Sequence, residues 1–336
     1  VDVLKPGLSR LFFHNVTVHD VPGIVEKYLV KNLTNHEKVF GYLGPDPIPD
    51  VLNLMEIPQY AMQQRIAMRN SGHIAPDDIF QYIANDGYAA LNKALFEMEA
   101  SDVIDEMKKS NLRGRGGAGF PAGLKWSFMV RSPGPPKYIA CNCEEGDPGA
   151  FNDKAILESD PHTLLEGVIL AGYATEATKG YIFIRHGHDG PIERMESAIE
   201  QAYESGLLGQ NILGSEFNFD VEIALTGDSY VAGEETALME AVEGKRSMPR
   251  FKPPFPAAAG LWQKPTTINN VKTFSYASQI VLRGGEWFSG IGTEKSTGTA
   301  IVCLTGLIEY PGIYEVPMGL TIREIIDKLG GGVSNG

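Results

Sequence analysis

Hydrophobic and polar residues follow two different periods in the middle of the chain. Three short apolar runs are typical of buried strands, and they cover residues 137–141, 181–185 and 221–226. A longer apolar run over 161–174 begins directly after Asp160, which predicts a helix capped by this aspartate. Apolar positions three and four residues apart between 192 and 203 predict an amphipathic helix. This alternation favours an α/β fold with a largely parallel sheet, in which ligands bind at the carboxyl ends of the strands.

The regions before this core have a different pattern. Residues 1–42 are predicted to form an appendage, with a strand at 11–18 and a short helix at 21–30. The stretch 44–49 is rich in proline and marks a boundary, after which residues 55–110 have a helical pattern. We therefore expect the main domain to begin at about residue 43 and to extend to about residue 295.

The pattern changes again over residues 296–336. Two strands are predicted there, at 299–304 and 312–316. Residues 321–324 (TIRE) have the spacing of a capping box for a helix that ends at Gly330. Two strands and a helix in this order suggest a small β-grasp-like, ubiquitin-like module. Because the chain has no initial methionine and stops shortly after this helix, we expect further residues at both ends.

The composition is typical of an ordinary globular protein. The 336 residues are 43% hydrophobic and 21% charged, which is enough for two or three folded domains. A formal net charge of −13 argues against a nucleic-acid partner, because affinity for phosphate backbones comes from Lys and Arg. Apolar runs such as 168–174 are shorter than the roughly 18 to 20 residues that cross a bilayer. We expect a cytoplasmic protein without direct membrane insertion, which partner subunits could still bring to a membrane surface.

The three cysteines, Cys141, Cys143 and Cys303, fit a reducing compartment. Cys141 and Cys143 are separated by one residue of a predicted strand, so both thiols should point to the same face. Since only one further cysteine exists, buried structural thiols are favoured over an iron–sulfur or zinc site. We therefore expect no metal site within these residues.

The segment 114–128, GRGGAGFPAGLKWSF, is the most distinctive stretch of the chain. Its five glycines allow backbone N–H groups to approach a ligand closely, while Arg115 and Lys125 supply positive charge. Three aromatic residues accompany them, so a phosphate on a flat aromatic molecule fits this segment. The spacing matches neither a P-loop nor the G-x-G-x-x-G of a usual Rossmann turn. The structural alternative is a glycine-rich turn without a ligand.

Three other segments carry polar side chains that suit a flat ligand with hydroxyl groups. Residues 141–153 (CNCEEGDPGAFND) place three carboxylates around a turn, where they repel one another unless they face water or a ligand. Residues 226–236 (TGDSYVAGEET) put two glutamates at the start of a helix expected over 234–242, where the helix dipole favours them. Residues 252–273 begin with KPPF and end with KPTTINNVKT, which collects Thr and Asn side chains suited to phosphate oxygens. A solvated acidic turn and a turn-rich connector are the structural alternatives for the first and the last segment.

Together these segments resemble the flavin-containing, NADH-binding 51-kilodalton subunit of respiratory complex I. The resemblance extends to its relatives in NAD-linked and electron-bifurcating hydrogenases and in formate dehydrogenases. It runs from about residue 50 to the end, and GRGGAGFP, EEGDPGAF, GEETALMEA and KPTTINNV carry it. The resemblance implies a Rossmann-like FMN- and NADH-binding domain over 43–295, with a parallel-sheet core, followed by the β-grasp-like module over 296–336.

The resemblance also implies which residues hold FMN. The expected FMN-binding residues come from all four segments and are Gly114, Arg115, Gly116, Gly117, Lys125, Asn142, Glu144, Gly233, Glu234, Asn269, Asn270 and Thr273. Glu144 stands where the family commonly has Asp. One additional methylene is compatible with a hydrogen bond to a ribityl hydroxyl group.

NADH is expected to stack its nicotinamide on the flavin. The expected NADH-binding residues are Glu145, Tyr230 and Glu235 around the nicotinamide half, Asp147 near the ribose, and Phe120, Phe128, Lys252 and Phe255 around the adenosine half. The resemblance implies hydride transfer from nicotinamide C4 to flavin N5, with Glu145 and Glu235 as positioning groups and no side chain as nucleophile or acid–base catalyst. Many family members have Glu at the position of Asp147, whereas hydrogenase relatives often have GDPGAF as here. This favours a soluble complex over a respiratory one.

The function implied is that of an FMN-dependent NADH oxidoreductase subunit, or an NAD⁺-reducing one, in a multi-subunit complex. Its expected partners are a thioredoxin-like [2Fe–2S] subunit and further iron–sulfur or catalytic subunits. The family usually continues into a helical [4Fe–4S] domain whose cysteine pattern is missing here, so that cluster is expected outside these residues. Residues 1–42 resemble the tail of a thioredoxin-like domain.

Two alternatives remain open at this point. The first is a non-catalytic assembly subunit that keeps the fold without binding flavin, although Gly116, Gly117, Lys125 and Asn269 are all present. The second is an NADP-specific relative. It is disfavoured because Asp147 or Glu235 would repel a 2′-phosphate placed near it.

Overall fold

The computed structural model describes residues 1–34, 37–44, 46–227 and 229–334. Packing divides the chain into two compact units. The first contains Val1–Gln63, Gly306–Tyr310 and Thr321–Gly336, and the second contains Gln64–Thr305 and Pro311–Leu320. Within the described part of the chain, no helix combines the length and the apolar character needed to cross a membrane.

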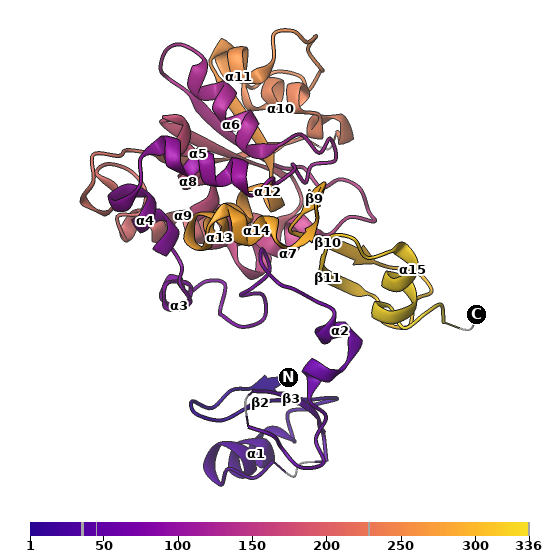
Figure 1. The fold of residues 1–336 in the computed structure, drawn as a ribbon. Coiled ribbons are helices and arrows are strands. Elements are labelled where there is room, and N and C mark those ends of the chain that lie inside the picture. The colour runs from indigo at the N-terminus through magenta and orange to yellow at the C-terminus, as the bar shows by residue number, and fades with distance from the viewer. Residues whose placement is uncertain (35–36, 45, 228, 335–336) are drawn as a thin grey trace. The chain divides into compact units, whose positions relative to one another are not determined.

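The first unit contains a small antiparallel sheet with one helix beside it (Figure 1). The strands pair in the order β1 (Asp2–Val3), β2 (Arg10–Phe13) and β3 (Val39–Leu43). The helix α1 (Val21–Ile24) continues directly into the π-helical turn η1 (Val25–Val30), which confirms the helix predicted at 21–30. The strand predicted over 11–18 ends early, at Phe13, because Asn15 has a φ of 49° and turns the chain.

The remaining elements of the first unit come from two distant parts of the sequence. They are η2 (Leu54–Glu56), α2 (Pro58–Ala61), α15 (Ile322–Glu324) and η6 (Ile325–Leu329). The predicted capping box is confirmed: the side chains of Thr321 and Glu324 each accept a hydrogen bond from the backbone N–H of the other residue. The side-chain amide of Gln59 donates a hydrogen bond to the carbonyl of Leu329 at 3.0 Å, which connects α2 to η6.

A four-stranded parallel sheet forms the centre of the second unit, which confirms the predicted α/β fold with a parallel-sheet core. Its strands are β4 (Tyr138–Cys143), β5 (Lys179–Arg185), β6 (Asp220–Thr226) and β7 (Thr266–Asn270), in the order β6-β5-β4-β7. Strand β7 lies in the segment whose Thr and Asn side chains were expected to suit phosphate oxygens, and for which no strand was predicted. Thr266 and Thr267 are fully buried in this strand, where β-branched side chains pack well.

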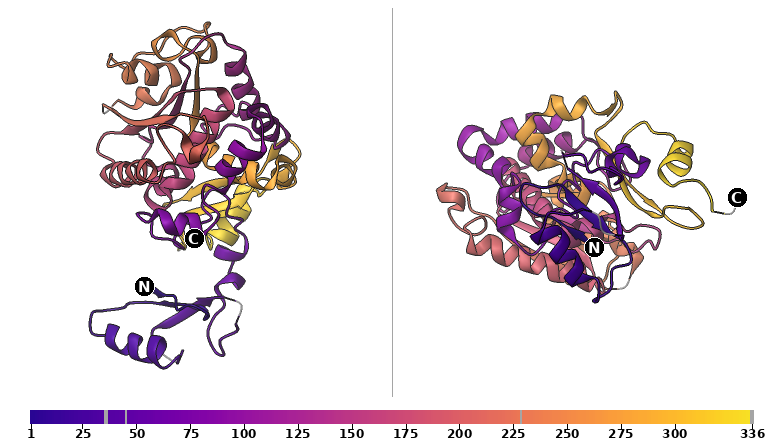
Figure 2. Two further views of the ribbon diagram at one scale, coloured as in Figure 1. Left: turned by 90° about the vertical axis from the view of Figure 1, so that its left-hand side faces the viewer. Right: turned by 90° about the horizontal axis from the view of Figure 1, so that it is seen from below.

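Helices pack around this sheet (Figures 1 and 2). The side chain of Asp160 accepts a hydrogen bond from the N–H of Thr163 at 3.3 Å at the start of α8 (Pro161–Thr175), as predicted. The helices are α3 (Ile79–Ala84), α4 (Ala89–Glu97), α5 (Ala100–Lys109), α6 (Ala122–Arg131), α7 (Asn152–Ser159), α8 (Pro161–Thr175), α9 (Asp189–Glu204), α10 (Glu235–Val242), α11 (Pro256–Ala259), α12 (Val271–Ser275), α13 (Ala277–Arg283) and α14 (Gly285–Ser289), with short 3₁₀ turns η3 (Ile212–Gly214), η4 (Tyr230–Gly233) and η5 (Leu261–Gln263).

The two faces of the sheet belong to two separate apolar cores. Alternate residues of β4, Ile139, Cys141 and Cys143, join the larger core, which includes α8. Ala140 points to the opposite face and joins the core that contains Leu238 of α10. Both thiols therefore lie on one face, as predicted, and burial raises the pKa of each well above its usual value. They stay protonated and serve as core side chains.

Two short antiparallel strand pairs complete the second unit. They are β8 (Gly292–Thr293) with β9 (Ser296–Thr297), and β10 (Thr299–Leu304) with β11 (Gly312–Pro317), the last two as predicted. Glu315 of β11 is fully buried, and its carboxylate accepts hydrogen bonds from the N–H groups of Ile66, Ala67 and Met68 at 2.9 to 3.1 Å. Burial raises the pKa of Glu315, and these donors offset part of that effect. This carboxylate fixes the segment that precedes α3.

Candidate functional site

Two adjoining cavities lie at the carboxyl ends of β4 and β7. The first, of about 310 Å³, is called the loop cavity because Gly114, Gly116 and residues 118–120 line it together with Lys125. The second, of about 510 Å³, is called the turn cavity because the acidic turn 144–153 lines it. Both cavities share Gly116, Asn142, Gly233, Glu234 and Asn270 in their walls. Both cavities therefore lie at the edge of the sheet where parallel α/β proteins bind their ligands.

The ends of the glycine loop are fixed by hydrogen bonds to the backbone and to one side chain. The N–H of Gly114 donates to the carbonyl of Phe120 at 2.9 Å and closes the loop on itself. The N–H of Arg115 donates to the hydroxyl of Thr273 at 2.9 Å, which fixes the loop to α12. Thr273, which was predicted as an FMN contact, thus holds the glycine loop through its hydroxyl oxygen.

The middle of the same loop is open toward the cavities. Gly116 lines both of them, and its N–H has no acceptor in the described part of the chain. A Cβ atom on Gly116 would lie 3.3 Å from the Cβ of Asn270, so any side chain there would press on the cavity wall. Gly117 has a φ of 107°, which favours glycine. This arrangement leaves a backbone donor available to an anionic or carbonyl oxygen.

The side chain of Arg115 does not point into the loop cavity. Its guanidinium donates to the carbonyls of Thr297 and Thr299 at 2.7 and 3.0 Å, and it lies 5.6 Å from the ring centroid of Tyr276. Burial lowers the pKa of Arg115, although the group remains charged. The positive charge expected from this residue therefore anchors the loop to the backbone of residues 297–299.

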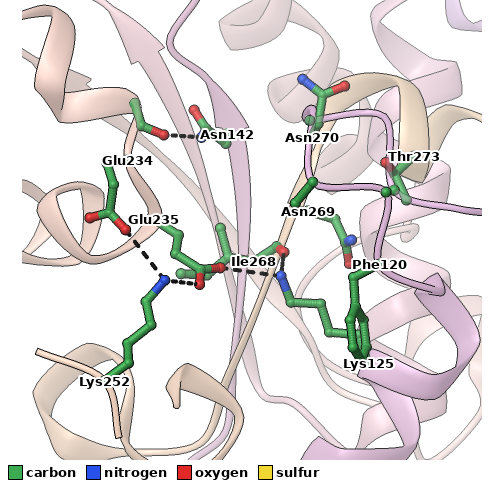
Figure 3. Close-up of a pocket in the computed structure, with 15 residues that line it drawn as sticks. Phe120, Lys125, Asn142, Glu234, Glu235, Lys252, Ile268, Asn269, Asn270 and Thr273 are labelled. Carbon is green, nitrogen blue, oxygen red and sulfur yellow. Dashed lines mark hydrogen bonds and ion pairs between the residues drawn. The ribbon is translucent and has the colours of Figure 1, made fainter. Parts of the chain in front are cut away.

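Positive charge reaches the loop cavity through two lysines (Figure 3). Lys125 donates to the carbonyl of Ile268 at 2.6 Å and to Glu235 at 3.3 Å, while Lys252 lies 2.5 Å from the other oxygen of Glu235. Burial lowers the pKa of Lys125, and Glu235 opposes this effect. Burial alone would raise the pKa of Glu235, but the two lysines outweigh it and lower that pKa. Glu235 is thus an ionised carboxylate between two cations.

The neighbouring Glu234 is the N-cap residue of α10. Its carboxylate accepts hydrogen bonds from the N–H groups of Thr236 and Ala237 at 2.9 and 3.0 Å. One of its oxygens also lies 3.4 Å from Lys252. The sequence predicted a helix start here and a favourable dipole interaction, and both are confirmed.

Three asparagines line the cavities, but their side chains have different partners. Asn142 donates to the carbonyl of Gly233 at 2.8 Å and accepts from the N–H of Glu144 at 3.1 Å. Asn270 donates to Asp153 at 2.5 Å and accepts from the N–H of Lys272 at 3.0 Å.

The third asparagine, Asn269, has a single side-chain partner in the described part of the chain. Its oxygen accepts a hydrogen bond from the indole N–H of Trp126 at 3.0 Å. Its amide nitrogen keeps both N–H donors for the loop cavity, which Asn269 lines (Figure 3).

The carboxylates of the acidic turn are engaged rather than free. The side chain of Glu144 is almost fully buried and forms an ion pair with Arg185. Glu145 accepts hydrogen bonds from the N–H groups of Asn152, Asp153 and Lys154 at 2.8 to 3.0 Å, at the start of α7. These contacts remove much of the mutual repulsion that the sequence implied.

Two further carboxylates complete the wall of the turn cavity. Asp147 closes the turn by accepting a hydrogen bond from the N–H of Gly149 at 2.9 Å. Asp153 is buried and pairs with Lys272 at 2.6 Å. Burial raises the pKa of Asp153, and Lys272 opposes this effect.

The predicted aromatic residues lie near the cavities or on their walls. Phe120 lines the loop cavity, and its ring centroid is 6.2 Å from that of Phe128, which is 40% exposed. Tyr230 lines the turn cavity and is 69% exposed, while Phe255 is 61% exposed. Large aromatic side chains with this exposure leave apolar surface available to a flat ligand.

The structure brings most of the predicted site residues to the two cavities. Phe128, Phe255 and Gly117 are the predicted residues that fall outside their lining in the described part of the chain. Side chains that the sequence did not single out are Trp126, Asp153, Arg185 and Lys272. Arg185 could have been found, because it ends a predicted parallel strand and the carboxyl ends of such strands face the ligand site.

Comparison with known proteins agrees with this geometry. A family model described as the Nuo51 FMN-binding domain matches residues 107–279, more than half of the chain, and an SLBB domain model matches residues 301–336. An NADH-quinone oxidoreductase subunit of Rhizobium meliloti (strain 1021) is 48% identical over 275 residues, which are 81% of this chain and 64% of that protein. NADP-reducing hydrogenase subunit HndC of Solidesulfovibrio fructosivorans is 49% identical over 274 residues, which are 82% of this chain and 56% of that protein.

A solved structure with the same fold covers nearly the whole chain. The crystal structure of an NAD⁺-reducing [NiFe]-hydrogenase in the H₂-reduced state aligns with a TM-score of 0.69 and 26% identity, over 96% of this chain and 51% of that one. The chain therefore spans between half and two thirds of the length of these relatives. The resemblance seen in the sequence motifs is confirmed, and the chain belongs to the Nuo51 FMN-binding domain family.

Proposed function

We propose that this chain is the FMN- and NAD(H)-binding part of an oxidoreductase subunit. It exchanges hydride between NAD(H) and FMN and passes single electrons to iron–sulfur clusters of a multi-subunit complex. The main observation behind the proposal is that three hydrogen-bond donors line the loop cavity together: the N–H of Gly116, the ammonium of Lys125 and the amide of Asn269. Membership of an FMN-binding family and relatives named as NADH-quinone oxidoreductase subunits support it.

The residues of the loop cavity fit FMN. Gly233 lines both cavities, and a Cβ atom there would lie 2.9 Å from a carboxylate oxygen of Glu144, so this position has no room for a side chain unless Glu144 moves. We propose that Lys125 and Asn269 bind FMN through their side chains, and that the glycine loop does so through its backbone. The other proposed FMN residues shape the wall through contacts within the protein, and they are Arg115, Asn142, Glu144, Glu234, Asn270 and Thr273.

NAD(H) is proposed to enter beside the same cavity. The exposed rings of Phe120, Phe128 and Phe255 offer stacking surface for the adenosine half, and Lys252 offers a cation for the pyrophosphate. Glu145, Tyr230 and Glu235 remain the proposed residues around the nicotinamide half, and Asp147 remains the proposed residue near the ribose. Glu145 is proposed to act by holding the N-terminus of α7, because its carboxylate is engaged there.

NADP is a second candidate for the nucleotide. A relative named as NADP-reducing is 49% identical to this chain, and Glu235 lies between two lysines that compensate its charge. We favour NAD(H), because Asp147, which lines the turn cavity, is the proposed ribose contact and its carboxylate would repel a 2′-phosphate beside it.

The chemistry of the proposed reaction belongs to the cofactors. FMN, when bound, couples two-electron hydride transfer to one-electron transfer. The residues of this chain bind the two cofactors, orient them and exclude water, since alignment within about 3 to 3.5 Å dominates the rate of such a transfer. Neither Cys141 nor Cys143 takes part, because both thiols are buried and protonated.

Further parts of the proposed complex follow from the family resemblance. We propose a [4Fe–4S] cluster outside these residues, a thioredoxin-like [2Fe–2S] partner subunit and a cytoplasmic location. The proposed domains are 1–42 as the tail of a thioredoxin-like domain, 43–295 as the FMN- and NADH-binding domain and 296–336 as a β-grasp-like module. The SLBB match at residues 301–336 supports the last of these limits.

Reconstitution with FMN tests the proposal. Purified protein incubated with FMN and desalted should retain a flavin absorption band near about 450 nm. The variant Gly116→Val should lose this band, because its side chain would press on Asn270 and cover the backbone donor. Absence of the band from the unaltered protein would favour the non-catalytic assembly role instead.

A further inference from the structure

The loop cavity contains one side-chain amide whose direction is set by a residue outside the cavity. Asn269 is only 7% exposed, and its oxygen accepts a hydrogen bond from the indole N–H of Trp126 at 3.0 Å. Trp126 is fully buried in α6 and lines neither cavity. The amide nitrogen of Asn269 has no partner within the described ranges of the chain, and the residue lines the loop cavity.

The chemistry of the indole group permits one orientation of this amide. An indole N–H is a donor only, so it can bind the oxygen of Asn269 and not its nitrogen. With the amide turned over, two donors would face each other in a buried place and both would be unsatisfied. The ring of Trp126 is itself held in the core, with its centroid 6.4 Å from that of Phe274. The hydrogen bond therefore directs both N–H donors of Asn269 away from Trp126.

The other two asparagines of the site differ in this respect. Asn142 and Asn270 each use their oxygen and their nitrogen in hydrogen bonds within the protein. Their amides therefore hold the acidic turn, the segment before α10 and the start of α12 in place. Asn269 is the one of these three whose amide nitrogen is left for a ligand.

We propose that Trp126 is a positioning residue of the flavin site, which acts through Asn269. It holds the amide so that its two N–H donors face the loop cavity, where they donate to an acceptor oxygen of FMN. This inference rests on the proposed function, because it takes FMN as the ligand of the cavity. It assigns to Trp126 a role that its location in the core alone does not require.

A double-mutant cycle on FMN affinity tests the inference. The Kd of FMN is measured by quenching of flavin fluorescence for the unaltered chain, Trp126→Phe, Asn269→Ala and the double variant. Each single change should weaken FMN binding by about tenfold, the effect of one well-placed hydrogen bond. The double variant should bind no more weakly than Asn269→Ala, because Trp126 acts only through that amide. The visible absorption band of bound FMN should shift in the same way in both single variants.

Two further variants separate positioning from general loss of stability. Met129→Ala removes a buried apolar side chain from the same helix, so it should lower the melting temperature but leave the Kd of FMN within about twofold. Asn269→Asp keeps an acceptor for Trp126 and removes both donors, so it should weaken FMN binding at least as much as Asn269→Ala. This variant keeps the inference testable even where Trp126→Phe folds poorly.

The possible failures have different meanings. The positioning role would be overturned if Trp126→Phe or Asn269→Asp bound FMN as tightly as the unaltered protein. It would also be overturned if the increases in the Kd of FMN from the two single changes multiplied in the double variant. In those cases the unaltered protein still binds FMN and the proposed function stands. Failure of the unaltered protein to bind FMN would overturn the proposed function and this inference together.

Discussion

Lys125 and Glu235 face each other in the loop cavity, with the ammonium nitrogen 3.3 Å from a carboxylate oxygen. The same ammonium donates to the carbonyl of Ile268, in the middle of β7, at 2.6 Å. Two fixed acceptors therefore hold the lysine beside Gly116 and Asn269. A cation held in this way can bind a phosphate or carbonyl oxygen with little loss of side-chain freedom, which is the property that a cofactor site needs.

Replacement of this cation should weaken FMN binding. We expect Lys125→Ala to raise the Kd of FMN by about tenfold or more, because a hydrogen bond to a charged group contributes about 1.5 to 3 kcal/mol. The measurement is the fraction of FMN retained after dialysis against a low flavin concentration. Lys108→Ala is the matched control, since Lys108 is on the neighbouring helix, half exposed and paired with Asp105. Equal retention in Lys125→Ala and the unaltered protein would show that Lys125 is not a flavin contact.

The exposed ring of Phe128 is predicted to contact NADH and not FMN, and one substitution tests this assignment. Phe128→Ala should raise the KM for NADH about three- to tenfold, because an aromatic contact contributes about 0.5 to 1.5 kcal/mol, and should leave the flavin content unchanged. Steady-state reduction of an artificial electron acceptor gives the KM, and the absorption spectrum gives the flavin content. Phe80→Ala, which removes a 76% exposed ring from α3, should change neither quantity. Loss of flavin with an unchanged KM would place Phe128 in the FMN site.

A buried histidine should make the stability of the protein depend on pH. His162 is 1% exposed, its Nδ1 atom lies 2.8 Å from the hydroxyl of Tyr88, and burial lowers its pKa to about 4 from the ordinary value of 6.5. The folded protein thus keeps this ring neutral below pH 6.5, while the unfolded chain already takes up a proton. The contribution of His162 to the free energy of unfolding is therefore fully present above pH 6.5. As the pH falls from 6.5 toward about 4, the free energy of unfolding decreases by about 3 kcal/mol.

Urea unfolding of the unaltered protein and of His162→Gln measures this effect. The difference between their free energies of unfolding should change by about 2.5 kcal/mol between about pH 7.5 and about pH 4.5, with the unaltered protein losing more. The exposed His19 provides the control variant His19→Gln, which should keep the pH dependence of the unaltered protein. A constant difference for His162→Gln across this range would show that His162 does not remain neutral in the folded protein.

The carboxylate of Glu315 should be important for stability. Glu315→Ala leaves the N–H groups of Ile66, Ala67 and Met68 without their acceptor, so the free energy of unfolding should fall by about 3 kcal/mol or more. Hydrogen exchange should accelerate at these three amides before it does so in β4. Glu294→Ala, at an exposed position, should leave both stability and exchange unchanged. Protection of residues 66–68 in Glu315→Ala would contradict this role.

The sequence was a reliable guide wherever local patterns decide the structure. The cap at Asp160, the three strands at 137–141, 181–185 and 221–226, and the capping box at 321–324 all depend on neighbours within a few residues, and all are present. The strand β7 was missed because its Thr and Asn residues suit both a strand and a phosphate site. Its burial depends on pairing with β4, more than 100 residues earlier in the chain.

The directions of side chains in the site could not be predicted in the same way. Arg115 was expected to supply charge to a phosphate, but its guanidinium donates to the carbonyl of Arg113 and to two carbonyls more than 180 residues later in the chain. Glu145 was expected to contact a nicotinamide, and its carboxylate is engaged at the start of α7. Local composition shows which residue types gather at a site. Long-range contacts decide which of them remain available to a ligand.

Anaerobic reduction of the reconstituted protein is the most direct test of the proposed function. FMN-loaded protein is mixed with NADH in the absence of oxygen, and the flavin band near about 450 nm is followed. Rapid bleaching by NADH, with a smaller rate for NADPH and much slower bleaching in Phe128→Ala at low NADH, is the result expected here. A flavin that binds to the protein but stays oxidised with excess NADH would contradict the proposal that this chain exchanges hydride between NAD(H) and FMN.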